Sequence, residues 1–184
     1  MAGEKHRVCP VSKLRGFDNA LRGLFHPPNK IFGPHVKPGM HVLDAGCGGG
    51  FAAVALARLA GPGGRVVAAD VQQEMLDITH RRASRLGLDR PLEYHLCDSD
   101  RMGVQGRFHF INAMMMVHET PDPAAFFHEA ATLLHNGGRL LLSEPRGHVN
   151  AKAFARELDH AAAAGLSVHS RPAVALCRAA ALVK

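Results

Sequence analysis

The sequence Val42-Leu43-Asp44-Ala45-Gly46-Cys47-Gly48-Gly49-Gly50 runs from an apolar strand into a bend of almost bare glycines. The apolar, alanine-rich stretch 51–60 follows directly and predicts a buried helix. A glycine bend between a strand and a helix lets backbone N–H groups approach a ligand that larger side chains would block. Because ligands of open α/β sheets bind at the carboxyl ends of strands, this stretch predicts a binding loop.

Strand and helix patterns alternate along the rest of the chain. Strands are expected at 41–44, 65–70, 92–97, 108–114 and 139–143, and helices at 51–60, 72–86, from 122 to the Asn136-Gly137-Gly138 stop, and from 150 to 165. Such alternation predicts a parallel sheet with helices on both faces. Two last strands, near 166–174 and 177–183, are too close for a parallel crossover and should form an antiparallel hairpin. The expected fold class is therefore α/β, a doubly wound Rossmann-like sheet of seven mostly parallel strands.

The 184 residues suit one domain, with a core from 38 to 184 and an N-terminal helical lid or cap over 1–37. Helices are expected around Leu14–Leu24 and after His26-Pro27-Pro28. Residues 1–37 carry seven Lys or Arg and two acids, within a chain of net charge +6. That segment is compatible with a basic flap over an anionic ligand, but a solvated extension is the favoured interpretation.

Hydrophobic runs and cysteine spacing indicate the cellular compartment in which the protein is expected. No apolar run approaches the ~20 residues that cross a bilayer, and no secretory signal opens the chain. The four cysteines, Cys9, Cys47, Cys97 and Cys177, form no CxxC pair and are expected to be free thiols. We therefore expect a cytoplasmic protein that does not span a membrane.

Two carboxylates flank the glycine bend. Asp70 ends the next strand, where it can accept hydrogen bonds from both hydroxyls of a ribose or cap the following helix. Asp44 precedes the bend, and a carboxylate there suits a ligand that carries a cation better than one that carries phosphates. S-adenosylmethionine (SAM) carries an ammonium and a sulfonium. The G-x-G-x-x-G pattern of dinucleotide sites is broken at Phe51, which favours SAM.

The run Val42–Gly50 resembles motif I of the class I SAM-dependent methyltransferases, commonly written VLDxGCGxG. Weaker similarity to later motifs of the family lies at Gly61–Asp70, Cys97–Ser99, Phe108–Asn112 with Val117–Glu119, and Leu134–Leu142. The resemblance extends over about residues 36–184 and is strongest to the small "type 11" group, kin of the quinone-biosynthesis C-methyltransferases. His135-Asn136 departs from the Lys-Pro that relatives usually carry before the glycine pair, at a turn away from the expected cofactor.

The resemblance implies a methyltransferase that uses SAM and releases S-adenosylhomocysteine (SAH). It implies roles for individual residues as well. Asp44 and the backbone of Gly46, Cys47, Gly48 and Gly50 would hold the methionine part, and Asp70 the ribose. Val71 would pack on the adenine, Asp98 or Ser99 would meet the adenine edge, and Asn112 would lie near the amino group.

Methyl transfer is an in-line displacement, so alignment is the main task and a base is needed only if the acceptor must lose a proton. Candidate groups near the strand ends are His118, Glu119, Glu144, His148 and His26. None of their spacings requires a metal. The run Met114-Met115-Met116 could line an apolar acceptor pocket or simply pack in the core.

The acceptor is expected to be a small molecule. Asn112-Ala113-Met114-Met115 lacks the prolines and the aromatic ring with which base-modifying enzymes hold a flipped nucleotide, which makes nucleic acid an unlikely partner. Two alternatives remain open: a non-catalytic SAM-binding module and a Rossmann-type oxidoreductase. A monomer and a homodimer are both compatible with the sequence.

Overall fold

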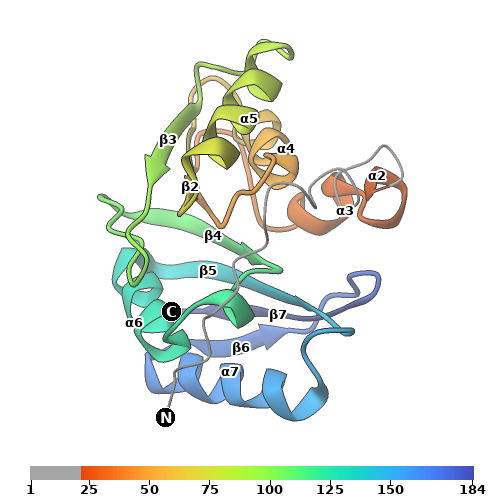
Figure 1. Cartoon of the computed structure of the whole chain (residues 1–184), viewed down its shortest axis with the longest axis vertical. Helices are drawn as coiled ribbons and strands as arrows, with labels where there is room; N and C mark the ends of the chain where they lie inside the picture. The colour runs from red at the N-terminus through yellow and green to blue at the C-terminus, as the bar shows by residue number, and fades with distance from the viewer. Residues whose placement is uncertain (1–21) are drawn as a thin grey trace.

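The computed structural model describes residues 22–184 and contains one seven-stranded sheet (Figure 1). Its strands lie in the order β3-β2-β1-β4-β5-β7-β6. They are β1 (His41–Ala45), β2 (Arg65–Asp70), β3 (Leu92–Leu96), β4 (Phe108–Met114), β5 (Leu134–Pro145), β6 (Ser167–Ser170) and β7 (Cys177–Val183). The first five pair in parallel, and β7 pairs antiparallel to both β5 and β6. The predicted fold class and the antiparallel terminal hairpin are confirmed.

Helices cover both faces of this sheet. They are α2 (Arg22–Phe25), α3 (Pro28–Phe32), α4 (Phe51–Ala60), α5 (Gln73–Ser84), α6 (Pro123–Leu133), α7 (Ala151–Ala163) and a single 3-10 turn, η2 (Val117–Glu119). Buried side chains of α3, α4 and α5 form one apolar cluster with the sheet, and those of α6 and α7 form a second. Figure 1 shows α4 and α5 beside the β2–β3 half and α6 and α7 beside the β5–β7–β6 half. The predicted helix around Leu14–Leu24 lies largely outside the described residues.

Side-chain caps fix the starts of two helices. Oδ1 of Asp122 accepts a hydrogen bond from the Ala125 N–H at 3.0 Å, and Pro123 occupies the first turn of α6. Oδ1 of Asn150 accepts one from the Ala153 N–H at 2.9 Å at the start of α7. Both caps satisfy backbone donors that have no partner within the helix.

The boundary between α6 and β5 differs from the prediction. The helix ends at Leu133 and the strand begins at Leu134, whereas the sequence pattern placed the helix stop at Asn136-Gly137-Gly138 and the strand start at Arg139. Pairing with β4 shifts within this stretch, so that several β5 residues bulge. The Gly137 N–H donates to the Lys184 carbonyl and the Lys184 N–H donates to the Gly138 carbonyl. The backbone of Lys184 therefore holds both glycines beside β7, and Gly137 has φ +75°, in the left-handed region that favours glycine.

The strand order places a topological switch between β1 and β4, which are adjacent and lead away in opposite directions across the sheet. Loops that follow two such strands separate and leave a crevice at their carboxyl ends. The glycine bend follows β1 and η2 follows β4, so both border this crevice. Within residues 22–184, no helix combines the length and the apolar character needed to cross a membrane.

Candidate active site

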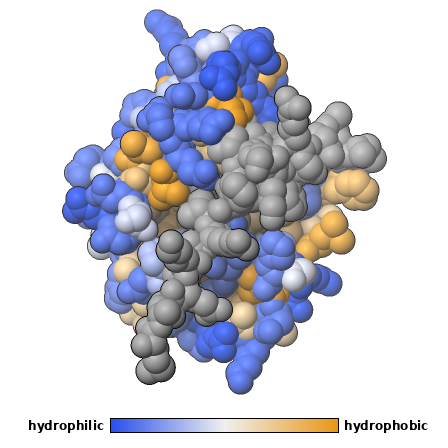
Figure 2. Space-filling view, viewed as in Figure 1, coloured by the Kyte–Doolittle hydropathy of each residue, from blue (hydrophilic) through white to orange (hydrophobic). Residues whose placement is uncertain are grey.

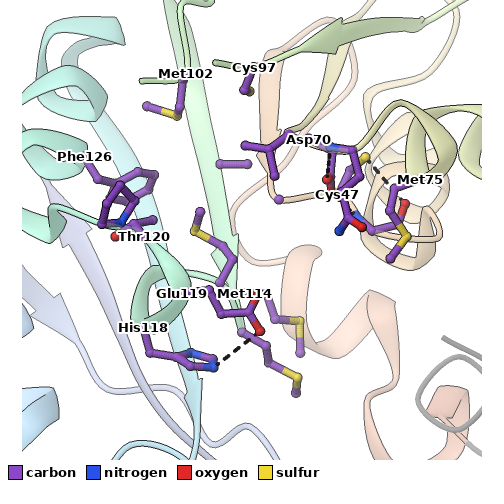
Figure 3. Close-up of a pocket in the computed structure, with 18 of the residues that line it drawn as sticks. Cys47, Asp70, Met75, Cys97, Met102, Met114, His118, Glu119, Thr120 and Phe126 are labelled. Carbon is purple, nitrogen blue, oxygen red and sulfur yellow. Dashed lines mark hydrogen bonds and ion pairs between the residues drawn. The ribbon is translucent and has the colours of Figure 1, made fainter. Parts of the chain in front are cut away.

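A cavity of about 950 Å³ opens at the carboxyl ends of β1, β2 and β4. Figure 3 shows its walls: Asp70, Cys47 and Met75 on one side, Phe126 and Thr120 opposite, and Met114, Glu119 and His118 below. Cavities of this size accommodate small organic ligands. The structure therefore has a cavity at the crevice that the strand order predicts.

Gly46, Cys47, Gly48 and Gly49 of the bend line this cavity, and three of these four residues have no side chain. Gly46 has φ +68°, in the left-handed region that favours glycine. A Cβ there would lie 2.8 Å from the Met116 Cβ, so a side chain has no room. The bend can therefore take a ligand directly against its peptide groups.

Asp70 faces the bend from the end of β2 and is 7% exposed. The Gly48 N–H donates to its Oδ2 at 2.9 Å and the Gln72 N–H donates to its Oδ1 at 3.0 Å. Burial raises the pKa of this carboxyl, and the hydrogen bonds from Gln72, Gly48 and Val71 oppose that rise. Each oxygen has further lone-pair capacity, so Asp70 can hold backbone and still accept from a ribose. The residues present fit an adenosyl ligand.

Two side chains of α5 hold the bend from behind. Oγ1 of Thr79 donates to the Gly48 carbonyl and the guanidinium of Arg82 donates to the Gly49 carbonyl, both at 2.8 Å. With those carbonyls bound, the peptide groups cannot rotate freely and the bend is rigid. Neither residue was predicted from the sequence to belong to the site. Threonine and arginine are common on helices, so these two can be assigned a role only once α5 is known to lie beside the bend.

The predicted adenine side of the site lines the same cavity, at Val71, Asp98 and Ser99. Asp98 forms a surface ion pair with Arg101 at 2.7 Å. The next turn of chain is held by Glu129, whose carboxylate accepts from the N–H groups of Met102 and Gly103 at 2.9 and 2.7 Å. The adenine contacts stay a prediction.

Three other predicted cofactor residues are not part of the cavity lining. Asp44 and Asn112 are almost fully buried, and the Asn112 amide donates to Oδ1 of Asp44 at 2.7 Å. Gly50 also lies outside the lining, where a Cβ would lie 2.8 Å from the Thr79 side chain. Asp44 and Asn112 therefore join β1 to β4 at the switch point. Their direct contact with the cofactor stays a prediction.

His118 and Glu144 form a buried hydrogen-bonded pair. Nδ1 of His118 lies 2.5 Å from Oε2 of Glu144, whose side chain is 0% exposed. Oε1 of Glu144 accepts from the Val117 N–H at 2.8 Å. A carboxylate only accepts hydrogen bonds, so Nδ1 carries the imidazole proton and Nε2 carries the lone pair. His118 lines the cavity and Glu144 does not, so Glu144 reaches the site only through His118.

The Nε2 side of His118 faces two further titratable groups. Oε1 of Glu119 lies 3.8 Å away and Nδ1 of His148 lies 3.4 Å away, and both residues line the cavity. Burial of the imidazole acts to lower the pKa of His118. The Glu144 hydrogen bond and the charges of Glu144, Glu119 and Glu157 outweigh it, so that pKa is raised. A histidine held in one tautomer by a carboxylate is suited to act as a general base.

The remaining candidates have mixed roles. His26 lines the cavity, but its Nε2 lies 2.9 Å from the Ala175 carbonyl, which ties the segment before α3 to the β6–β7 connection. Met114, Met115 and Met116 all line the cavity and also pack against the apolar clusters, so neither of the two interpretations excludes the other. Among residues 22–184, no group of three or more His, Cys, Asp or Glu is arranged to hold a metal ion.

Comparison with known proteins shows the family to which this chain belongs. A family model described as "Methyltransferase domain" matches residues 36–171. A ubiquinone biosynthesis O-methyltransferase of Xanthomonas campestris pv. campestris (strain B100) is 35% identical over 108 residues, which are 58% of this chain and 43% of that protein. The chain thus spans less than half the length of this curated relative.

Solved structures share the fold. A SAM-dependent methyltransferase from Aquifex aeolicus has a TM-score of 0.85 at 24% identity, covering 96% of this chain and all of that one. The [4+2]-cyclase SpnF has a TM-score of 0.67 at 22% identity, covering 78% of this chain and 58% of that one. The second name shows that the fold alone does not fix the reaction. The family model, the motif around the glycine bend and the Asp70 geometry agree, and the chain belongs to the class I SAM-dependent methyltransferases.

Proposed function

We propose that this chain transfers the methyl group of SAM to a small-molecule acceptor and releases SAH. The observation that carries the proposal is the hydrogen bond from the Gly48 N–H to Asp70, which places a buried carboxylate against a glycine-rich bend that lines the cavity. The family membership favours this reaction over that of an oxidoreductase. A small-molecule acceptor is supported by the name of the curated relative, a ubiquinone biosynthesis O-methyltransferase.

Binding and alignment fall to the rigid parts of the site. Bound SAM would supply an electrophilic methyl group on a sulfonium leaving group. The Gly46–Gly49 backbone and Asp70 would hold it, and Thr79 and Arg82 would keep the bend in place. The methionine side chains at 114–116 would keep water away from the reacting atoms. Positioning of two reactants is worth roughly 7–11 kcal/mol in favourable cases, so these groups supply most of the catalysis.

His118 would take the proton of an acceptor that must lose one. His118 lines the cavity, and with Nδ1 bound to Glu144 the Nε2 lone pair of the neutral ring is its basic site; Glu144 both fixes the tautomer and stabilises the imidazolium that forms. Oε1 of Glu119 lies 3.8 Å from Nε2, beyond hydrogen-bond reach, and its charge would further stabilise the imidazolium. We therefore assign His118 as the general base and Glu144 as its positioning residue.

The surroundings of the site extend the proposal. His26 lines the cavity from the segment before α3, which supports a covering role for that part of residues 1–37. Cys47 and Cys97 are free thiols, which supports a reducing compartment such as the cytoplasm.

Calorimetric titration with SAM and with SAH tests the function. Both should bind, and Asp70→Ala should weaken both by about 100-fold because it removes the ribose acceptor and an anchor of the bend. Glu74→Gln, which neutralises an exposed carboxylate on the neighbouring helix α5, is the matched control and should change nothing. Absence of binding at millimolar ligand would refute the proposal. SAM binding without SAH formation on any acceptor would show a non-catalytic SAM-binding module.

A further inference from the structure

A second hollow, of about 970 Å³, lies beside the active-site cavity. It is formed by the α2–α3 segment, by α7, and by the connection between β6 and β7. We propose that this second groove binds the anionic, apolar end of the methyl acceptor, and that the acceptor is therefore an amphipathic anion. The inference rests on the proposed methyltransferase function, and it names the class of its second substrate.

The two hollows adjoin at one boundary. Arg146 and Leu176 line both of them. The Arg146 N–H donates to the Leu176 carbonyl at 2.9 Å, and Nε of Arg146 donates to the Cys177 carbonyl at 3.0 Å. These bonds hold the guanidinium at the boundary and leave its two terminal nitrogens without a partner among residues 22–184. A molecule that passes from one hollow to the other must pass this cation.

The lining of the second groove carries positive charge alone. It includes Lys30, Arg146, Arg171 and Arg178, and neither Asp nor Glu contributes to it. Within the described part of the chain, none of the four forms an ion pair with an acid. Like charges without counter-charges raise the local potential and attract an anion, and arginine binds carboxylate or phosphate through several N–H groups at once.

The same groove exposes large apolar side chains. Phe25 is 56% exposed and Leu176 is 74% exposed, while Phe154 and Ile31 lie buried against the groove. Leu176 has φ +59°, a conformation that costs a non-glycine residue energy, so the fold holds this leucine outward at the boundary. In Figure 2, hydrophobic atoms reach the surface on the side where α2 and the β6–β7 connection lie. Apolar surface beside unpaired cations matches an apolar chain that carries an acidic group.

Fluorescence titration with dansyl-undecanoate and with its methyl ester, in the presence of saturating SAH, tests the proposal. The probe has an aromatic ring at one end and a carboxylate at the other. The acid should bind about tenfold more tightly than the ester. Arg171→Gln, in the second groove alone, should remove most of that preference. Arg85→Gln removes an exposed arginine outside both hollows and should leave it unchanged.

Gly147→Leu shows whether one ligand occupies both hollows. Gly147 lines only the first cavity, and a Cβ there would meet nothing within 4 Å, so the substitution fills space without disturbing the fold. A ligand that spans the boundary should be weakened about tenfold by Gly147→Leu as well as by Arg171→Gln. Weakening by Arg171→Gln alone would confine the anion to the second groove and overturn its assignment to the acceptor.

The remaining outcomes separate the two proposals. Equal binding of acid and ester, or competition by a single-stranded oligonucleotide, would overturn the amphipathic anion. Calorimetric titration with SAH on the same preparation reports the methyltransferase function independently. Binding of SAH without a preference for the acid leaves that function standing and refutes only the acceptor class.

Discussion

His118 and Glu144 show how one hydrogen bond can set the chemistry of a site. The Glu144 carboxylate raises the pKa of His118 against the effect of burial, so the imidazole is protonated at low pH and becomes a base only above that raised pKa. Glu144→Gln keeps an oxygen for the Val117 N–H but removes the charge. We expect the pKa of His118 to fall, measured by NMR titration of the imidazole in the SAH complex.

The rate should change in the same variant. With an acceptor that must lose a proton, Glu144→Gln should reduce kcat by about 100-fold and move the acidic limb of the pH–rate profile to lower pH. Glu119→Gln, whose carboxylate lies farther from the ring, should move that limb less. An unchanged limb in Glu144→Gln would exclude the pair from proton transfer.

Glu157, on α7, is a buried carboxyl that the proposed chemistry does not use. Burial, and then the charge of Glu144, raise its pKa to about 8. The folded protein therefore binds a proton that the unfolded chain releases near pH 4, so its stability should fall as the pH rises from about 4 to about 8. Glu157→Gln should remove this loss and be about 2 kcal/mol more stable than wild type at pH 9. Urea unfolding at pH 5 and pH 9 measures the free energy of unfolding of wild type and variant. Asp159→Asn, which changes an exposed carboxylate on the same helix, is the control.

The sequence predicted which titratable residues lie near the site more accurately than it predicted which residues they contact. His118 and Glu119 follow β4, and position along the chain alone placed them at the cavity. The same reasoning also offered Glu144, ranked below His118 and Glu119, as a group that acts directly on the substrate, whereas its carboxylate binds Nδ1 of His118 and does not line the cavity. Thr79 and Arg82 could not be found, because their role depends on how close α5 lies to the bend.

At the scale of elements, the bend and α4 depend on contact with α5. Gly50 has φ +81°, and a Cβ there would lie 2.8 Å from the Thr79 side chain. Gly50→Ala should cost about 2–4 kcal/mol, from backbone strain plus overpacking. Gly39→Ala is the matched control, because Gly39 has φ +83° and nothing within 4 Å of its Cβ, so strain alone should cost about 1 kcal/mol. Equal losses in urea unfolding would show that the Thr79 contact does not matter.

Elements that are set by local pattern were predicted residue for residue, and the others were not. α4, β2, β4 and β7 have the expected bounds, because each is a mainly apolar run that local sequence is enough to delimit. The predicted start of β5 was wrong, because residues 137 and 138 form backbone hydrogen bonds with Lys184, which is distant in the sequence. The sequence around β5 cannot reveal a contact with a residue more than forty positions away.

At the scale of the whole molecule, one sheet separates two apolar clusters. Leu182 of β7 lies in the cluster under α6 and α7, and Leu56 of α4 lies in the cluster on the opposite face. Strands β1, β2, β4, β5 and β7 contribute side chains to both clusters, so neither face can lose its packing while the sheet stays intact. This arrangement favours a single cooperative unfolding transition.

Tyr94 allows that cooperativity to be measured. It is the only tyrosine in a chain without tryptophan, and it packs against the cluster that contains Leu56. Leu182→Ala and Leu56→Ala should each cost about 2–5 kcal/mol, because both side chains are fully buried. In both variants, urea unfolding followed by Tyr94 fluorescence should coincide with unfolding followed by circular dichroism. If Leu182→Ala shifts only the circular dichroism transition, the two faces unfold separately, and the active site between them rests on two independent halves.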